Sequence, residues 1–431
     1  MSRKNQRRSS SRGRRQASPK PDRRASALQF EKAQQSYVSG QVFKAKLRLQ
    51  KLLRVAPEHV DAIMLLARIH TENTDYNRGA ALVRKAIEYR PKNAQLRVNL
   101  GEVLFQAGDR TGALKALYAA HEIDGSHLQA LEGVSSLLLA QAKEQQSAQL
   151  WGEARCFLEQ FCRAAPSNVP KRWRLAECYE REGKLDERAQ LLREILALEG
   201  PDSSAAYLLA AMENDGSVRE GHLGYVRDVF DAAASQFDTA LVEELGYVVP
   251  KKIHDQLDAI SPPGTVFQHV LDLGCGTGLV AEALGARCQT LVGVDISSKM
   301  VEIAQDKGLY TDLFVESIDH YLTRCEARFD LVIAADVLIY IGQLESTFQQ
   351  IFDVMEDGGL FIFSVEHGAD QGVELNPSGR FSYSRDYIDQ CLTAVGFRAV
   401  KVEATPLRME GSSEVSGLIF SLQKEPACVP D

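Results

Sequence analysis

The stretch that decides the fold is Gln268-His-Val-Leu-Asp-Leu-Gly-Cys-Gly-Thr-Gly-Leu279. Its apolar residues Val270, Leu271 and Leu273 predict a buried strand, and the glycine run that follows ends that strand. The residues after the glycines alternate like the start of a helix. Glycines between a strand and a helix let the backbone approach a ligand, with amide N–H groups and the helix dipole directed at it. The stretch therefore predicts a ligand-binding turn.

The spacing of the glycines distinguishes between ligands. Gly274, Gly276 and Gly278 occupy every second position, whereas a dinucleotide fingerprint needs its third glycine or alanine at the position of Leu279. With Asp272 two places before the first glycine, the stretch resembles motif I of the class I S-adenosylmethionine-dependent methyltransferases. A glycine-rich turn without a ligand is the alternative.

The resemblance implies a Rossmann-like, seven-stranded α/β domain at residues 222–424 that binds S-adenosylmethionine. Asp295 ends the next predicted strand, Leu291-Val-Gly-Val-Asp295, and should hold the ribose hydroxyls. Ile296 should press on one face of the adenine, and Glu316 or Ser317 should accept a hydrogen bond from the adenine amine. The cofactor-binding residues that the resemblance implies are Asp272, Gly274, Cys275, Gly276, Gly278, Asp295, Ile296, Met300, Glu316, Ser317, Asp336 and Val337.

The fourth strand, Phe329 to Asp336, ends in an acid that should face the cleft, because ligands lie beyond the carboxyl ends of parallel strands. Methyltransferases that act on amide or exocyclic amino nitrogens usually carry Asn or Asp followed by Pro-Pro-Tyr here. This chain instead continues Val337-Leu338, and it has no Pro-Cys pair for attack on cytosine. Both features argue against DNA as the substrate.

Three residues are candidates for catalysis. A base is needed when the methyl acceptor is a hydroxyl, an acidic carbon or an ammonium, and His367 and Tyr383 are the candidates. Arg380 could bind a carboxylate or phosphate of the acceptor. The stretch Gly379 to Ser384 resembles a group of predicted bacterial methyltransferases that contain tetratricopeptide repeats, although these tend to have histidine where this chain has Tyr383. A solvated loop histidine and a structural arginine ion pair are the alternatives.

Composition limits the partners. The 431 residues predict two domains, and 45% hydrophobic with 25% charged residues is ordinary for a globular protein. The net charge is −8, but residues 1–24 hold ten Lys or Arg against one acid, so the rest of the chain carries −17. We expect no specific nucleic-acid binding by so acidic a body.

The eight cysteines form no CxxC pair and show no Cys/His metal spacing. They are typical of reduced thiols, which predicts a cytoplasmic protein without a metal site. No apolar run approaches the ~18 residues that a membrane span needs, so no span is predicted.

A helical pattern repeats along residues 27–213. Pro57, Pro91 and Gly125 follow one another at equal intervals, and Pro166 and Pro201 continue the series after a short insertion within 141–149. The period of about 34 residues resembles that of tetratricopeptide repeats and predicts an all-α solenoid of about five units, with Ser203–Met212 as a capping helix. A small residue at the same place before each marker should let paired helices cross closely, and these are Ala45, Gly79, Ala113, Ala154 and Ala189.

The remaining segments complete the organisation. Residues 1–26 predict a disordered basic tail, 214–221 a linker, and 222–262 a helical lead-in in which Phe237 or Tyr247 could form a lid over the cofactor.

The sequence thus predicts a methyltransferase that acts on an oxygen or carbon of a small hydroxylated or acidic metabolite. Its repeat groove would bind a peptide or protein, or else serve as a spacer or dimer surface. The alternatives are methylation of a protein recruited through the groove, and a cofactor-binding scaffold without catalysis.

Overall fold

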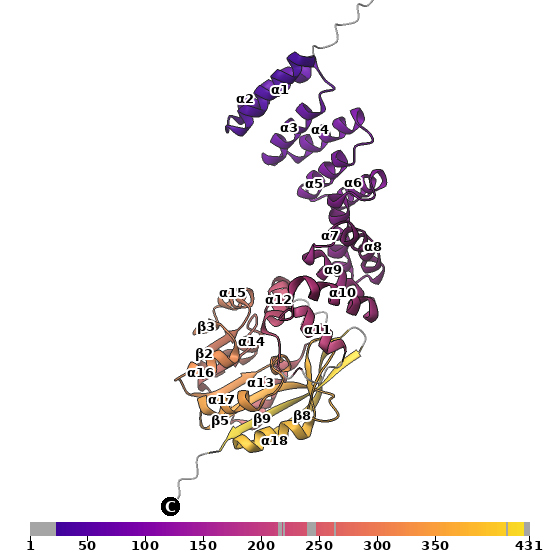
Figure 1. The fold of residues 1–431 in the computed structure, drawn as a ribbon. Coiled ribbons are helices and arrows are strands. Elements are labelled where there is room, and N and C mark those ends of the chain that lie inside the picture. Colours follow the sequence, from indigo (N-terminus) through magenta and orange to yellow (C-terminus); the bar gives the residue numbers. More distant parts are fainter. Residues whose placement is uncertain are drawn as a thin grey trace, which may run out of the picture. The chain divides into compact units, whose positions relative to one another are not determined.

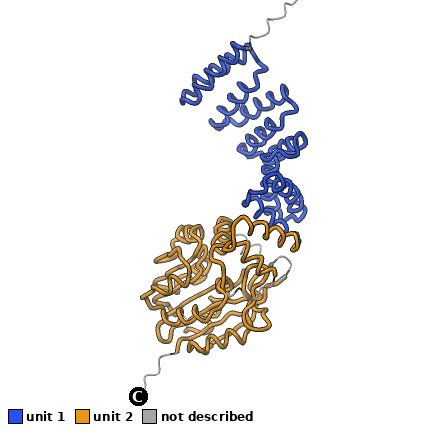
Figure 2. Tube along the Cα trace, in the orientation of Figure 1, with its two compact units in different colours: residues 1–184 blue, residues 185–431 orange. Residues whose placement is uncertain are grey.

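A computed structural model describes residues 23–213, 218, 220–238, 247–262, 264–410 and 413–425. The chain divides into two compact units, residues 1–184 and 185–431 (Figure 2).

The first unit is a series of helix pairs, as the repeat pattern predicts. Helices α2, α4, α6 and α8 each end two residues before one of the predicted markers at 57, 91, 125 and 166. The described helices of this unit are α1 Arg23–Val38, α2 Val42–Val55, α3 Val60–Glu72, α4 Tyr76–Tyr89, α5 Ala94–Gln106, α6 Arg110–Ile123, α7 Leu128–Gln145, α8 Ala148–Ala164 and α9 Val169–Arg181 (Figure 1).

Small residues allow the paired helices to cross closely. A Cβ on Gly101 of α5 would lie 2.8 Å from Cγ of Leu117 on α6, so the close approach depends on the missing side chain. Ala45, Ala113 and Ala154 are completely buried at the predicted crossings. The insertion within 141–149 lengthens α7 to 18 residues and α8 to 17.

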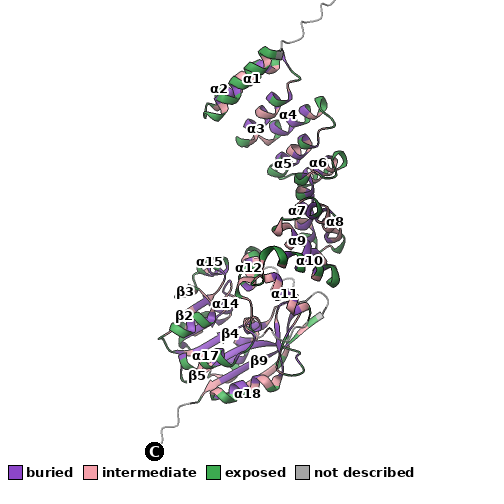
Figure 3. Ribbon diagram, viewed as in Figure 1, coloured by how far each residue is buried: buried purple, intermediate pink, exposed green. Residues whose placement is uncertain are grey.

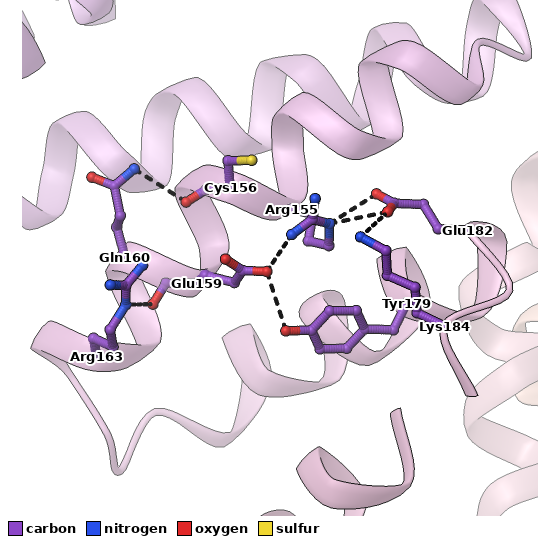
Figure 4. A network of polar contacts seen from close by, with 8 residues as sticks. All are labelled: Arg155, Cys156, Glu159, Gln160, Arg163, Tyr179, Glu182 and Lys184. Carbon is purple, nitrogen blue, oxygen red and sulfur yellow. Dashed lines mark hydrogen bonds and ion pairs between the residues drawn. The ribbon is translucent and has the colours of Figure 1, made fainter. Parts of the chain in front are cut away.

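A polar network joins α8 to α9 and the turn that follows it (Figure 4). Arg155 donates from Nε to Glu182 at 3.0 Å and also pairs with Glu159. The Tyr179 hydroxyl donates to Glu159 at 3.2 Å, and Lys184 pairs with Glu182 at 2.7 Å. Each charged group of this cluster has a partner of opposite charge, which suits its half-buried position.

The structure bears on two boundaries predicted from the sequence, the end of the tail at residue 26 and the end of the repeat domain at residue 213. Helix α1 begins at Arg23, inside the predicted tail of residues 1–26, and residues 1–22 lie outside the described residues. Helices α10 and α11 group with the second unit. In particular, the hydroxyl of Tyr207 on α11 donates to the carbonyl oxygen of Gly379 at 2.9 Å. A domain boundary at residue 213 remains a prediction.

The predicted linker is only partly described. Residues 214–217 and 219 lie outside the described residues. Glu220 forms a β-bridge with Gly342, and the N–H of Gly221 donates to Ile341 at 3.0 Å. The end of the predicted linker therefore already packs on the sheet-containing unit.

The second unit combines one sheet with helices. Its described helical elements are α10 Leu185–Glu199, α11 Ser204–Met212, α12 Leu223–Ala233, η1 Ala234–Gln236, α13 Val249–Ile260, α14 Leu279–Leu284, η3 Gly285–Arg287, α15 Ser298–Lys307, α16 Ile318–Arg324, η4 Leu338–Tyr340, α17 Glu345–Val354 and α18 Arg385–Val395. Its described strands are β1 Phe267–Leu273, β2 Cys288–Asp295, β3 Asp312–Val315, β4 Phe329–Ala334, β5 Met355–His367, β6 Val373–Leu375, β7 Phe381–Tyr383, β8 Phe397–Glu410 and β9 Ser413–Lys424.

The sheet contains the predicted seven strands. Strands β3-β2-β1-β4-β5 are parallel, β9 pairs antiparallel with β5, and β8 pairs antiparallel with β9. The sequence did not predict β6 and β7, a short antiparallel pair that joins the end of β5 through Ser382 and Tyr383.

The strand order reverses between β1 and β4. Right-handed crossovers therefore place the helices after β1 and β2 on one face, and those after β3 and β4 on the other. The strands between these layers are buried, with Leu271, Leu331 and Ile362 fully enclosed (Figure 3). In such sheets a ligand binds beyond the carboxyl ends of the strands at the reversal point.

Candidate active site

A cavity of about 270 Å³ opens at this reversal point. Its walls come from the carboxyl ends of β1 and β2, from the lead-in helices, and from the loop that follows β4. Of the predicted cofactor residues, those that line it are Gly274, Cys275, Gly276, Asp295, Ile296, Glu316, Ser317, Asp336 and Val337.

The glycine turn forms one wall of this cavity. Gly274 has φ +71°, and a Cβ there would overlap the side chain of Val337, so both the backbone and the space require glycine. Gly276 has φ +54° and donates its N–H to Oδ2 of Asp295 at 2.9 Å. This bond joins the turn after β1 to the acid at the end of β2.

Asp295 is held in place by backbone donors. Its other oxygen, Oδ1, accepts from the N–H of Ser297 at 2.8 Å. Burial raises the pKa of Asp295, and the N–H groups of Ser297 and Gly276 act in the opposite direction. The second acid predicted from the sequence therefore lies on the cavity wall beside the glycine turn.

Asp272, the first acid, lies behind the turn rather than on the cavity wall. Its Oδ2 accepts from the hydroxyl of Tyr310 at 2.7 Å, while Oδ1 is buried without a hydrogen-bond partner among the described residues. Burial raises the pKa of Asp272 to about 7, with a further increase from the charge of Asp295. The two acids are thus close enough to influence each other.

Two other predicted cofactor residues also lie behind the surface of the cavity. Met300 is completely buried in α15, and Gly278, with φ +94°, packs against the ring of Tyr310. Cys275 does line the cavity, and burial raises the pKa of its thiol well above the usual value.

Aromatic residues of the lead-in segment cover the turn. Phe230, Phe237 and Tyr247 line the cavity, and a lid formed by Phe237 or Tyr247 stays a prediction. Sequence reasoning missed the polar contacts of the residue after Phe237. Asp238 accepts from Lys307 Nζ at 2.7 Å and from the Thr277 hydroxyl.

A second polar contact holds α12 against the cavity wall. Asp231 accepts from the hydroxyl of Ser297 at 2.6 Å, the same residue whose N–H donates to Asp295. Helix α12 and the acid of the cavity wall are thus joined through one serine.

The predicted adenine end contains Ile296, Glu316 and Ser317, which line the same cavity. The carboxylate of Glu316 pairs with Arg324 and with His320, so its oxygens are already engaged. The Ser317 hydroxyl caps α16 by accepting from the N–H of His320. Asp319, which the sequence did not single out, adds another carboxylate to the lining.

A charge cluster around the buried side chain of Arg408 borders the cavity. Arg408 of β8 donates from Nη1 to both oxygens of Asp336, at 2.8 and 2.7 Å, and from Nη2 to Glu366. Arg380 donates from Nε to Glu366 at 2.8 Å. Asp336, Arg380 and Arg408 line the cavity, and Arg408 was missed because it lies on a late strand without a motif.

The backbone at Asp336 is strained. Its φ is +55°, a region that residues with a side chain rarely adopt, and its N–H donates to the Ser364 hydroxyl at 2.8 Å. Such strain is retained where the surrounding structure holds it, and it clusters at functional sites.

The two candidate bases lie elsewhere. Tyr383 is fully buried and its hydroxyl donates to the Leu338 carbonyl at 2.8 Å, while burial raises its pKa well above the usual value. His367 is exposed at the end of β5 and contacts the carbonyl of Tyr383 through Nδ1 at 3.1 Å. Neither occurs among the described residues that line the cavity. The geometry therefore does not support the expectation that one of them acts as the base.

Within the described residues, every helix is too short or too polar to span a lipid bilayer. The same residues contain no group of three His, Cys, Asp or Glu side chains arranged to hold a metal ion.

The chain is similar to known proteins in both regions. Residues 245–402 match the family model of a methyltransferase domain, and residues 66–127 match that of a tetratricopeptide repeat. The ubiquinone biosynthesis O-methyltransferase of Azoarcus sp. (strain BH72) is 28% identical over 137 residues, which are 28% of this chain and 59% of that protein. The enzyme of the same name from Coxiella burnetii (strain Dugway 5J108-111) is 26% identical over 133 residues, 27% of this chain and 56% of that one.

The chain thus spans somewhat over half the length of these curated relatives. Among solved structures, the 1,6-didemethyltoxoflavin-N1-methyltransferase of Burkholderia thailandensis aligns with a TM-score of 0.37 and 18% identity, covering 47% of this chain and 88% of that one. The two family matches thus show a methyltransferase domain at residues 245–402 and a tetratricopeptide repeat at residues 66–127 of this chain, in agreement with the glycine turn and the sheet order.

Proposed function

We propose that the chain transfers the methyl group of S-adenosylmethionine to an oxygen or acidic carbon of a small hydroxylated or acidic metabolite. The observation that carries the proposal is the hydrogen bond from the Gly276 N–H to Asp295. It puts the glycine turn and a carboxylate next to each other at the cavity. The names of the two relatives favour oxygen as the acceptor atom.

The cofactor end of the cavity fits this molecule. Asp295 has the position that suits ribose hydroxyls, and Ile296 supplies an apolar face for the adenine. Among the described residues of the lining, the charged ones are four acids and two arginines, namely Asp295, Glu316, Asp319, Asp336, Arg380 and Arg408. This excess of negative charge favours a cationic ligand such as a sulfonium.

The acceptor end contains the arginine–carboxylate cluster. When bound, S-adenosylmethionine supplies a methyl group on a positively charged sulfur, so the chain mainly has to align the acceptor with it. The Asp336 carboxylate, which lines the cavity and accepts from Arg408, would take the proton of an acceptor hydroxyl. Burial raises the pKa of Tyr247 and of Tyr340 above the usual value, so these cavity residues stay protonated at neutral pH and would not act as the base.

Arg380 would orient an acidic acceptor. It lines the cavity, and a guanidinium matches a carboxylate or phosphate in two-point geometry. The aromatic lid residues Phe230 and Phe237 would exclude water from the reacting atoms.

The proposal is tested by turnover. The full chain, incubated with S-adenosylmethionine and a panel of phenolic and carboxylic metabolites, should form S-adenosylhomocysteine with at least one of them. Asp336→Asn should lower kcat by about 100-fold or more, within the usual contribution of general base catalysis. Cofactor binding without turnover on any small molecule or cell extract would favour the scaffold.

Methylation of a protein recruited by the helix pairs is the alternative, and the match to tetratricopeptide repeats favours it. It predicts that turnover requires the protein fraction of an extract and disappears after proteolysis of that fraction. Turnover supported by the small-molecule fraction alone would exclude this alternative.

A further inference from the structure

The outward face of α2, Val42–Val55, carries exposed apolar and basic side chains together. Phe43 is 82% exposed and Leu47 is 45% exposed. Lys51 and Arg54 are also exposed, and the spacing of three and four residues puts all four on one side of the helix. We call these four residues the α2 face, and Figure 3 colours much of this helix as exposed.

The repeat itself provides a comparison for this face. In the next unit, the equivalents of Phe43 and Leu47 are Asn77 and Ala81, which are both exposed. In the third unit they are Thr111 and Lys115, again exposed. Packing of the helix pairs therefore does not require a large apolar side chain here, so the exposed Phe and Leu of α2 need another explanation.

The charge of this end of the chain is equally uneven. Residues 1–58 contain 16 Lys or Arg against three acids, whereas the whole chain has a net charge of −8. Within the described residues, the basic residues of α2 at positions 44, 46, 51 and 54 form no ion pair. Further along the unit Arg78 pairs with Asp75, Arg110 with Glu144, and Arg155 with two glutamates (Figure 4).

We propose that the α2 face binds the surface of a membrane that contains anionic phospholipid. Basic side chains are attracted to the negative headgroups, and apolar side chains between them enter the boundary with the acyl chains. A nucleic acid would explain the charge but not the aliphatic Leu47 beside Phe43, because phosphate contacts need only Lys, Arg and polar groups. The proposal concerns a peripheral contact and is independent of the proposed methyl transfer.

The experiment measures co-sedimentation of the full chain with two kinds of vesicle. Vesicles of phosphatidylglycerol and phosphatidylcholine should retain the protein, and vesicles of phosphatidylcholine alone should not. Lys51→Gln should weaken binding by about fivefold, the usual effect of one basic residue near an anionic surface. Phe43→Asn should weaken it by about tenfold, because a half-inserted aromatic ring is lost.

The repeat also supplies the controls. Lys85 is the exposed equivalent of Lys51 in α4, and Lys85→Gln should leave vesicle binding unchanged. Asn is the residue that α4 carries in place of Phe43, so the helix pair tolerates it, and an unaltered circular-dichroism melting curve verifies folding. Absence of binding to the anionic vesicles, or equal binding by wild type and Phe43→Asn, overturns the proposal. Retention by single-stranded RNA but not by vesicles would assign the face to nucleic acid instead.

Discussion

The buried carboxyl of Asp272 makes a quantitative prediction about stability. It is completely buried below the glycine turn, with one oxygen bonded to Tyr310 and the other without a partner among the described residues. Asp272→Asn keeps the shape of the side chain and removes its charge. The variant therefore isolates the free energy that the native state loses when this carboxyl ionises.

The sign follows from the raised pKa. Burial takes the pKa of Asp272 from 3.8 to about 7, so the native state binds the proton more tightly than the unfolded state. Below about pH 4 both states are protonated and the group has no effect. Above about pH 7 both are ionised, and the native state has lost roughly 4 kcal/mol, at about 1.4 kcal/mol per pKa unit.

Thermal or urea unfolding of the second unit in the absence of cofactor measures the effect. Relative to wild type, Asp272→Asn should gain about 4 kcal/mol of stability between pH 4 and pH 8, or roughly 8 °C or more in Tm for a unit of this size. Asp312→Asn, at an exposed carboxylate of β3, is the control and should show no such gain. A stability difference for Asp272→Asn that stays constant across this pH range would refute the reasoning.

Three further substitutions test the site. Gly274→Ala should cost at least roughly 1–2 kcal/mol of stability for its left-handed φ, and it should abolish cofactor binding because its Cβ overlaps Val337. Melting curves measure the first effect and calorimetry the second. Normal binding would contradict the close approach of Gly274 to Val337. Arg408→Leu should destabilise the second unit by about 3–5 kcal/mol in urea, because the carboxylates of Asp336 and Glu366 both lose their buried cationic partner and, among the described residues, only Glu366 keeps another, Arg380. A loss within experimental error would mean that Arg408 is not buried in solution. Tyr383→Phe should retain kcat/KM and its pH profile, and it should lose about 0.5–1.5 kcal/mol of stability because the hydrogen bond to Leu338 is removed. A large fall in kcat alone would instead indicate that the Tyr383 hydroxyl acts as the base.

Local patterns predicted the elements that carry the cofactor site. The glycine turn and the acid at the end of β2 lie within one strand–helix–strand segment, so their spacing along the chain fixes their separation in space. The regular repeat of the helix-ending markers predicted the helix pairs for the same reason, because each pair is built from one short segment.

Contacts between distant segments could not be read from the chain. Asp336 and Arg408 are 72 residues apart, and Asp238 and Lys307 are 69 apart, with no motif to mark either pair. Tyr383 lies in the short strand β7, which the sequence did not predict. Successive side chains of a strand alternate between the two faces of the sheet. This alternation does not tell which face borders the cavity.

The central claim is that Asp295 and the glycine turn bind S-adenosylmethionine, and isothermal titration calorimetry tests it most directly. The full chain should bind one equivalent, and Asp295→Ala should weaken binding by at least roughly tenfold, as expected when a charged hydrogen-bond acceptor is lost. Asp312→Ala should bind like wild type. Undetectable binding by the wild-type chain, or equal affinity in the Asp295→Ala variant, would contradict the account.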